Sequence, residues 1–590
     1  MNEAMLAHAA ASKASFGRRR TAYPLDMTLA DLVERRIAIS PRVVNRVEPT
    51  AGATPSVILD RLRANGSAVL LGAPGAGKSM ALLQLASAWS GAEVTPILIR
   101  IAEVIEEIEV LRRLLSQAGN PPPVLLLDGL DEAMATPDSR PETARALRAL
   151  MSLAPTVLTS RTRDFEEAAY LDRYGIVVDD LYELLPWRTD IEFSLFVRRL
   201  HASGHLSRTS LVADVASSPG LSRLASRPLH ARMLTLVMEI DPTNPPETQS
   251  DLYGSYLYHL GRVADTSLAG RGCHLPQGAF DYWLDVAWVV FDSGTAAPEP
   301  GAIIKATTEV GGPSATCLRS AIDVIANRVP HGGGERLEFV HYSFFEWLLA
   351  TRIRQRISER PMTVDLLFET FSRDLPREVR HHLRQQLGSI SAQMTNDLVR
   401  HYLAAHQRTA DARATLAVCN LIVYLISRCA RNAAPALREL LEEEREPFLA
   451  SALLWSLTHQ GDGAATAEFF RRFSLDDGWR RITRGYTLYY YGDLSDVNGP
   501  PYFDLDPYES CDRSLQALNE IFASRAVDKI PKERQAVDLL TILDILDTRS
   551  LRLTRDRFAP IVDAATRVTD ALRTPDVTHE IHSRLSRVLV

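Results

Sequence analysis

Eight consecutive residues in the first hundred have the side-chain and backbone properties that hold a phosphate group. They match the pattern G-x-x-x-x-G-K-[ST], the P-loop, directly after an apolar run and before a helical one. Glycines let backbone N–H groups curl around phosphate oxygens, and the following helix offers its positive N-terminal end. We expect the Lys78 ammonium to bind the β- and γ-phosphates and the Ser79 hydroxyl to bind Mg²⁺. The expected nucleotide-binding residues are Gly72, Pro74, Gly75, Ala76, Gly77, Lys78, Ser79 and Met80.

The scarcity of lysine makes this match informative. Of the 66 basic residues only five are lysine, a bias typical of GC-rich coding, and one of the five stands where a P-loop requires an ammonium. With 31 glycines and five lysines in 590 residues, about 0.002 accidental matches are expected per chain. A Gly-rich turn without function is therefore strongly disfavoured.

A short acidic segment follows about fifty residues later. Four apolar residues, Val124 to Leu127, precede Asp128, which predicts a buried strand that delivers a carboxylate at its end. Alone this pattern also fits a surface turn, but after a P-loop it favours a Walker-B acid that holds Mg²⁺ through water. Asp131 and Glu132 come next. We expect one of them, preferably Glu132, to polarise the attacking water, while the other caps a turn.

A third polar group ends another apolar run. In the segment TVLTSR the chain passes from apolar residues to Thr159, Ser160 and Arg161. Arg161 could sense or stabilise the γ-phosphate, since fixed cations act on the charge that develops in phosphoryl transfer. An ordinary surface salt bridge is the alternative, and the sequence leaves both open.

The segments around these residues alternate between apolar runs and helical patterns. SAVLLGAP, TPILIRI, PVLLLDGL and TVLTSR read as strands separated by helices, and IVVDDLYELLP reads as the last strand. Continuous apolar strands alternating with helices are typical of a parallel sheet buried on both faces. Residues 56–186 are therefore predicted to form an α/β P-loop NTPase domain.

The remaining chain divides into four parts. A Thr189–Glu192 capping box should open a helical lid domain. A hairpin in RVPHGGGERLEFVHY, followed by a second capping box at Ser343 and Glu346, predicts a winged-helix domain. The predicted parts are an N-terminal tail and short segment (1–55), the lid (187–265), the winged helix (266–358) and an all-α sensor or scaffold region (359–590).

Composition limits the class of protein. A chain of 590 residues that is 46% apolar requires several packed domains. Its net charge of −7, and the single arginine in the turn HGGGER, weigh against nucleic acid as a partner. Five scattered cysteines without CxxC spacing predict neither a disulfide framework nor a zinc site. The longest apolar run, 416–426, is too short to span a bilayer, and we expect a cytoplasmic protein without membrane contact.

Three motifs together resemble the NACHT class of STAND-type signalling NTPases, which are related to AAA+ proteins. The first is the segment DGLDE, residues 128–132, with a small residue after the Mg²⁺ acid and two further acids. The second is Ser226-Arg227-Pro228-Leu229, similar to the family's asparagine-proline-leucine motif although Ser-Arg replaces the usual residues. The third is FVHYSFFEWLLA, residues 339–350, close to the signature of the family's winged helix. The resemblance covers residues 56–358.

The resemblance implies a nucleotide-gated switch with slow ATP hydrolysis. By analogy, Pro228 would lie against adenine, and His341 would bind the β-phosphate of ADP and lock a closed state. A trigger recognised by the C-terminal region would open the protein, ATP would replace ADP, and protomers would assemble as homo-oligomers. Bacterial members act in defence against phage, so a phage protein is the expected trigger. The alternatives are an AAA+-like ATPase that acts on DNA through the winged helix and a scaffold with a degenerate pocket.

Overall fold

The computed structural model divides into two compact units, residues 1–352 and 353–590. The residues that it describes are 7, 9–11, 13–14, 30, 37–40, 42–45, 53–89, 94–116, 121–133, 140–161, 176, 178–293, 298–307, 313–331, 334–359, 363–371, 375, 377–388, 390–406, 412–430, 432–444, 447–459, 462, 464–465, 468, 539, 543, 562–563, 565–570, 578–579, 581–583 and 585. The aromatic run RGYTLYYYGD, residues 484–493, which the sequence predicts to be structural with a recognition surface as the alternative, lies outside them.

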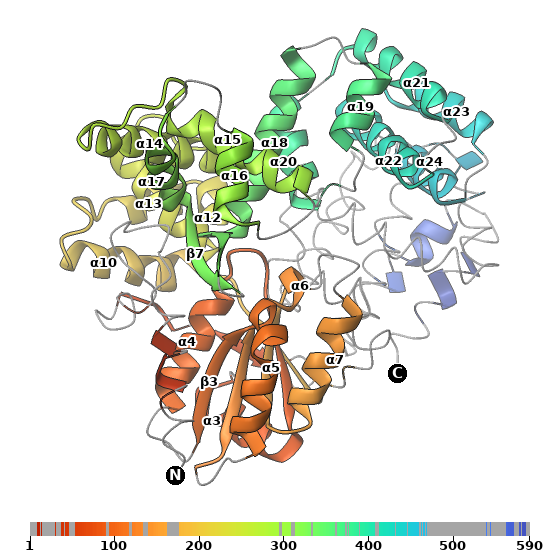
Figure 1. Cartoon of the computed structure of the whole chain (residues 1–590). Coiled ribbons are helices and arrows are strands. Elements are labelled where there is room, and N and C mark those ends of the chain that lie inside the picture. The colour runs from red at the N-terminus through yellow and green to blue at the C-terminus, as the bar shows by residue number, and fades with distance from the viewer. Residues whose placement is uncertain are drawn as a thin grey trace. The chain divides into compact units, whose positions relative to one another are not determined.

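The first unit contains a six-stranded sheet (Figure 1), in the order β1-β6-β2-β5-β4-β3. The strands are β1 (Val43–Asn45), β2 (Ser67–Leu71), β3 (Thr95–Arg100), β4 (Pro123–Asp128), β5 (Thr156–Ser160) and β6 (Asp180–Leu184). Strands β2 to β6 are parallel, as expected. Strand β1, from the N-terminal segment, adds an antiparallel edge beside β6.

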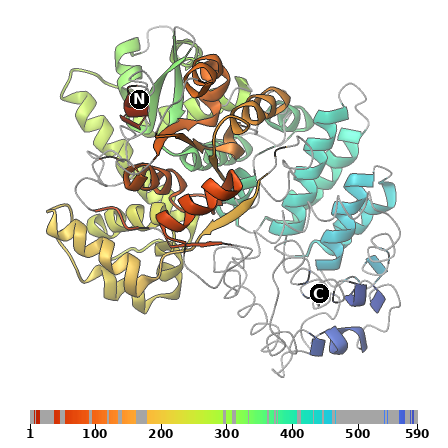
Figure 2. The same ribbon diagram turned by 90° about the horizontal axis from the view of Figure 1, so that it is seen from below.

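Helices cover both faces of this sheet (Figure 1 and Figure 2). They are α3 (Pro55–Asn65), α4 (Lys78–Trp89), α5 (Ile101–Ser116), the short α6 (Leu130–Ala133) and α7 (Arg140–Met151). Apolar residues of α5 and α7 share one buried cluster with alternate residues of the strands, such as Val69 and Leu125. On α4, Trp89 is buried and its indole N–H donates to the Pro55 carbonyl at 3.0 Å, which joins α4 to α3. Burial on both faces explains why the strands are continuous apolar runs.

The strand order decides which side chains meet. Strand β5 lies between β2, which leads into the P-loop, and β4, which ends in Asp128. Because parallel strands end at the same edge, the last residues of β5 lie between the P-loop and the acid. The sequence shows three strands but not this order, which brings Thr159 to the centre of the site.

A group of helices follows the sheet: α10 (Ser194–Ala202), α11 (Leu211–Ser217), α12 (Pro219–Ala225), α13 (Pro228–Ile240) and α14 (Gln249–Ala269). Helix α13 is buried along most of its length and packs against α12 and α14. This agrees with a helical segment after the sheet, while the exact division into a lid remains a prediction.

The capping box expected at Thr189 is wrong. The chain forms a π-helical turn, η2 (Thr189–Phe193), with Arg188 as its N-cap and no side-chain cap. Glu192 accepts from the Arg188 backbone N–H at 2.7 Å and lies 3.1 Å from the Arg42 guanidinium. Burial by itself would raise the pKa of Glu192, but these partners outweigh it and lower the pKa. The carboxylate is thus used to anchor Arg42 as well as the turn.

The predicted hairpin is confirmed. Three helices, α15 (Gly278–Ser293), α16 (Pro300–Thr307) and α17 (Ala315–Ile325), precede β7 (Ala326–His331), β8 (Gly334–Phe339) and α18 (Tyr342–Glu359). The two strands pair antiparallel, with Asn327 opposite Glu338. The indole N–H of the buried Trp283 donates to the Ala321 carbonyl at 2.9 Å and ties α15 to α17. This is the element order that a winged helix requires, although its assignment as one remains a prediction.

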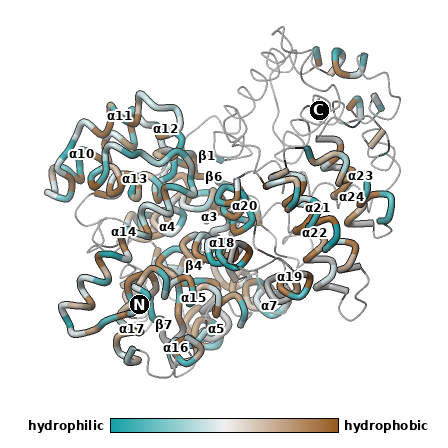
Figure 3. Tube along the Cα trace, turned by 90° about the horizontal axis from the view of Figure 1, so that it is seen from above, coloured by the Kyte–Doolittle hydropathy of each residue, from teal (hydrophilic) through white to brown (hydrophobic). Residues whose placement is uncertain are grey.

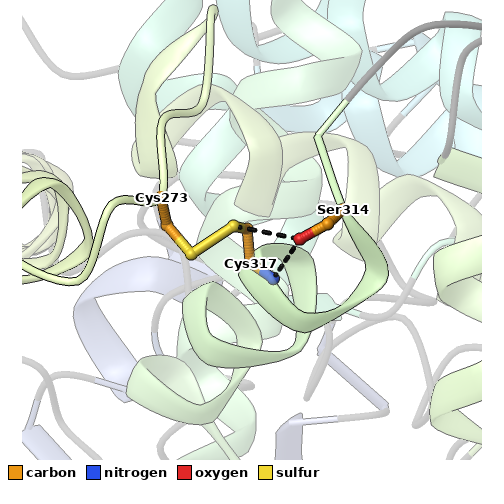
Figure 4. Close-up of a disulfide and its surroundings, with 3 residues drawn as sticks. All are labelled: Cys273, Ser314 and Cys317. Carbon is orange, nitrogen blue, oxygen red and sulfur yellow. Dashed lines mark hydrogen bonds between the residues drawn. A yellow bond between two sulfur atoms is a disulfide. The ribbon is translucent and has the colours of Figure 1, made fainter.

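A disulfide joins Cys273, just after α14, to Cys317 in the first turn of α17 (Figure 4). Ser314 caps this helix by accepting from the Cys317 backbone N–H at 3.3 Å, and its hydroxyl lies 3.2 Å from the Cys317 sulfur. The expectation that the scattered cysteines form no disulfide is therefore wrong for this pair. Its members are 44 residues apart, and only folding brings them together.

Cys273→Ser should lower the stability of the first unit by about 2–4 kcal/mol in oxidising buffer, because the cross-link restricts the unfolded chain. Thermal unfolding with and without a thiol reductant measures this effect. The difference between the variant and the parent should vanish under reducing conditions. An equal loss in both buffers would show that the serine disturbs packing and that the cross-link contributes nothing.

Helices dominate the described part of the second unit: α19 (Val364–Phe371), α20 (Arg377–Leu387), α21 (Ala392–His406), α22 (Ala412–Cys429), α23 (Ala434–Glu443) and α24 (Pro447–His459). Figure 3 shows apolar and polar residues interleaved along these helices. The Tyr424 hydroxyl donates to the Arg380 carbonyl at 3.2 Å, and burial together with Glu444 raises the pKa of the Cys419 thiol to about 12. The predicted all-α character is confirmed here. No helix among the described residues is long and apolar enough to cross a membrane.

Candidate nucleotide-binding site

The P-loop connects β2 to α4 as the sequence predicts. Two of its glycines, Gly75 with φ 76° and Gly77 with φ 91°, adopt the left-handed backbone that other residues avoid. The Ala76 N–H donates to the Ala73 carbonyl at 3.0 Å and tightens the turn. Helix α4 then begins at Lys78, so its N-terminal end faces the loop. A loop of this kind offers several backbone donors to one anion.

The Lys78 side chain extends back across the P-loop. Its Nζ donates to the Gly72 carbonyl at 3.0 Å and to the Ala73 carbonyl at 3.4 Å. The ammonium is half-buried, and it lies where the sequence placed it. A cation beside the N-terminal end of a helix attracts phosphate groups.

Asp128 is held between two hydroxyl groups. Ser79 Oγ donates to its Oδ2 at 2.7 Å, and Thr159 Oγ1 donates to its Oδ1 at 2.7 Å. The Gly129 backbone N–H donates in turn to Thr159 Oγ1 at 2.9 Å. Asp128 is 7% exposed and Thr159 is fully buried, so the carboxylate has little freedom to rotate. Sequence reasoning did not place Thr159 beside Asp128, since this contact depends on strand order.

The residues at this point fit a magnesium ion. Mg²⁺ prefers hard oxygen ligands and keeps several of its waters. The Ser79 hydroxyl and the Asp128 carboxylate supply adjacent oxygens next to the lysine that faces phosphate. Ser79 would bind the ion directly and Asp128 would hold it through water, as the sequence predicts.

Asp131 and Glu132 follow Asp128 in the short helix α6. Gly129, with φ 85°, makes the turn between β4 and this helix. The backbone therefore places both acids just beyond the carboxyl edge of the sheet. Their side chains lie outside the described part of the structure, so their catalytic roles remain predictions.

The start of α13 packs directly on the P-loop. The Leu229 backbone N–H donates to the Gly75 carbonyl at 3.1 Å, and the Pro228 ring lies 3.7 Å from where a Cβ on Gly77 would stand. Pro228 and Leu229 are both buried. The sequence motif is therefore next to the loop, while contact of Pro228 with adenine remains a prediction.

Gly75→Ala should strongly destabilise the packing of the start of α13 on the P-loop. A Cβ there would lie 2.9 Å from the Leu229 Cβ, in addition to the strain of φ 76°. We expect a loss of about 2–4 kcal/mol, measured by urea unfolding, with weaker nucleotide binding. Gly204→Ala is a matched control, because Gly204 also has φ 76° but has nothing within 4 Å of its Cβ position. Equal effects of the two variants would contradict close packing of α13 on the loop.

His341 belongs to the same site although it is far from the P-loop in sequence. It lies between β8 and α18, and its Nδ1 accepts from the Ser343 backbone N–H at 3.3 Å. Burial, followed by the positive charges of Arg161, Lys78 and Arg232, lowers the pKa of His341 to about 3. The ring is thus neutral at physiological pH and can act as a hydrogen-bond donor to phosphate, although that contact remains a prediction.

The second capping box, at Ser343 and Glu346, is also wrong. The Ser343 hydroxyl lies 2.7 Å from His341 Nδ1, and Glu346 Oε1 accepts from Arg161 Nη1 at 3.0 Å. Both side chains leave the helix terminus because tertiary partners offer stronger, buried interactions. The pattern S-x-x-E marks the start of a helix correctly, but its side chains belong to the site.

Arg161 is held by the hairpin and helix at 326–352. Besides its ion pair with Glu346, its guanidinium carbon lies 5.6 Å from the centre of the Tyr342 ring. Glu346 is 1% exposed on its side chain and Arg161 is 12% exposed, so this is no ordinary surface salt bridge. A second ion pair, Arg100 with Glu338, joins the end of β3 to β8. In Figure 1 the hairpin that contains β7 accordingly extends to the sheet.

Arg232 is a further cation that sequence reasoning missed. It lies on α13, one helical turn after Pro228, and burial lowers the pKa of its guanidinium to about 10. Its Nε is buried and has no hydrogen-bond partner among the described residues. The i, i+4 spacing from Pro228 could have revealed it, since such residues share one helix face.

The site thus combines a phosphate loop, a magnesium-binding pair and several convergent cations. Residues 68–163 match the family model described as ATPase family associated with various cellular activities (AAA). This part of the chain is an AAA-family P-loop NTPase domain. The matched residues include the loop, Asp128 and Arg161, and the AAA family match suggests nucleotide hydrolysis. No curated protein matches the chain.

Several solved structures resemble the chain. The Orc1 protein of Aeropyrum pernix in complex with DNA is 17% identical with a TM-score of 0.26, covering 50% of this chain and 90% of its own. Cdc6p of Pyrobaculum aerophilum is 13% identical with a TM-score of 0.22, covering 53% and 98%. The description of the first as a DNA complex contradicts our expectation that weighed against nucleic acid as a partner, and we withdraw that expectation.

Proposed function

We propose that the chain is an ATP/ADP-gated signalling switch of the NACHT type. In its resting state ADP is held in a closed first unit, and a trigger opens it so that ATP enters and protomers assemble. The observation that supports this most is the position of residues 338–346. They contribute Glu338 and Glu346 to buried ion pairs with the AAA domain, and they place His341 where the charge of Lys78 lowers its pKa.

The geometry supports a closed state with restrained catalysis. Arg161, which could stabilise charge on the γ-phosphate, is paired with Glu346 instead. As long as this pair persists, a cation useful for hydrolysis is occupied, so we expect slow turnover. Release of α18 from the sheet would free Arg161 and remove His341 from the nucleotide at the same time.

A trigger must bind the open form more tightly than the closed form, since equal affinity shifts nothing. Moving the equilibrium from 1:99 to 99:1 requires about 5.5 kcal/mol of differential binding. The helical second unit is the proposed receptor for that trigger. The resemblance to the NACHT class supports a phage protein as the trigger. It also supports antiphage defence in bacteria as the biological role.

The test uses the full chain purified without added nucleotide. We expect ADP to co-purify, identified by mass spectrometry after denaturation, and basal ATP hydrolysis to be slow. Addition of phage proteins should release ADP and raise the mass measured by light scattering. Fast hydrolysis with no retained nucleotide, unchanged by phage proteins, would contradict the proposal. Hydrolysis stimulated by duplex DNA, with salt-dependent submicromolar binding, would instead favour an ATPase that acts on DNA.

A further inference from the structure

A buried series of hydrogen bonds leads from α14 to His341. The Tyr253 hydroxyl donates to Ser343 Oγ at 2.7 Å, and Ser343 Oγ lies 2.7 Å from His341 Nδ1. Tyr253 is 1% exposed and Ser343 is 2% exposed, so water does not compete for these bonds. Neither Tyr253 nor Ser343 has a role in the phosphate chemistry described above.

The donors and acceptors fix the direction of this series. The Ser343 backbone N–H also points to His341 Nδ1, at 3.3 Å, which makes Nδ1 an acceptor. The Tyr253 hydrogen occupies one lone pair of Ser343 Oγ, and the Ser343 hydrogen is then available to Nδ1. A neutral imidazole that accepts at Nδ1 must carry its hydrogen on Nε2.

We infer that Tyr253 and Ser343 are positioning residues that hold His341 in its Nε2–H tautomer, so that the ring presents a neutral N–H donor to a phosphate group of a bound nucleoside diphosphate. This inference rests on the proposed function for the identity of the ligand. The orientation of the ring hydrogen itself follows from the contacts of Tyr253 and Ser343.

The series also reaches the helix that packs on the P-loop. His230, buried on α13, has its Nε2 3.4 Å from the Tyr253 hydroxyl, and the two rings meet edge to face at 5.6 Å. One tyrosine hydroxyl therefore lies between α13 and the start of α18. Separation of α18 from α14 breaks the hydrogen bond from Tyr253 to Ser343. His341 is then no longer held in a single tautomer.

The experiment is ¹⁵N NMR of the full chain labelled at histidine, with the His341 signals assigned by their loss in His341→Gln. In the parent protein we expect an unprotonated Nδ1 and a protonated Nε2. Tyr253→Phe and Ser343→Ala should each produce a mixture of tautomers and weaken ADP binding about three- to tenfold in calorimetry. Ser343→Thr, which keeps the hydroxyl, should restore both properties.

Tyr256→Phe is the matched control. Tyr256 is buried on the same helix and, like Tyr253, its ring packs on Phe344, at 5.6 Å. Loss of its hydroxyl should leave the tautomer and the ADP affinity unchanged. If Tyr253→Phe fails to fold, the comparison of Ser343→Ala with Ser343→Thr decides the question alone.

An unchanged His341 tautomer in Tyr253→Phe and Ser343→Ala would overturn the inference, whatever happens to stability. An equal change in Tyr256→Phe would overturn it as well. The proposed function can fail separately: a chain that retains no ADP but shows the expected tautomer changes would refute the switch and leave the positioning role intact.

Discussion

Lys78→Ala should weaken the binding of ADP and ATP by about 100-fold or more. The Lys78 ammonium lies within hydrogen-bond distance of two carbonyls that line the loop, where it would meet the phosphates. Two charge-assisted hydrogen bonds of about 1.5 kcal/mol each correspond to a loss of this size. Isothermal titration of each nucleotide into the purified variant measures it, and thermal unfolding checks that the fold is retained.

Lys305→Ala provides the control for this experiment. Lys305 is the exposed lysine at the end of α16, so its replacement removes the same charge from the same unit. We expect no change in nucleotide affinity. If Lys78→Ala bound ADP as well as the parent chain does, the assignment of residues 72–80 as the phosphate site would be wrong.

Arg161→Ala should open the first unit and speed the release of bound nucleotide. The variant removes the guanidinium that pairs with a carboxylate whose side chain is 1% exposed. Breaking a buried ion pair by removing one partner costs about 3–5 kcal/mol, because it leaves the other charge in a poorly solvated place. Nucleotide dissociation followed by stopped-flow fluorescence should be accelerated by about 100-fold, with a lower thermal unfolding temperature.

Two further variants distinguish the loss of the Arg161–Glu346 ion pair from a general destabilisation of the fold. In Arg161→Ala combined with Glu346→Gln, the unpaired charge is gone, and much of the lost stability should return. Arg328→Ala, on β7, breaks more exposed ion pairs with Asp323 on α17 and Glu335 on β8 and should cost at most about 1 kcal/mol. Dissociation rates in Arg161→Ala equal to those in Arg328→Ala would contradict a closing role for the Arg161–Glu346 pair.

Much of the architecture was predictable from local sequence patterns. The apolar runs of β2 to β6 predict buried parallel strands because a strand covered on both faces has no polar side. The hairpin at 326–339 was predictable from a Gly-rich turn between two extended arms. The disulfide was not, because Cys273 follows α14 and Cys317 lies on α17, 44 residues later, and their spacing matches no motif.

The short polar motifs were located correctly and interpreted only in part. Thr189 and Glu192 were expected to cap each other, yet Glu192 pairs with Arg42, which is far away in sequence. Ser343 and Glu346 likewise accept hydrogen bonds from Tyr253 and Arg161 instead of capping the helix. A capping box competes with any buried partner that folding brings within reach, and the sequence does not show which partners arrive.

The sequence by itself determined the phosphate loop, because its requirements are local. Only glycine adopts the φ values at 75 and 77 without strain, and Lys78 follows them directly in the chain. The tertiary structure decided what surrounds the loop. Strand order inserted Thr159 beside Asp128, and packing of segments 185 residues apart joined Arg161 to Glu346. These contacts depend on how whole elements stack, which is a property of the packed core and of no single segment.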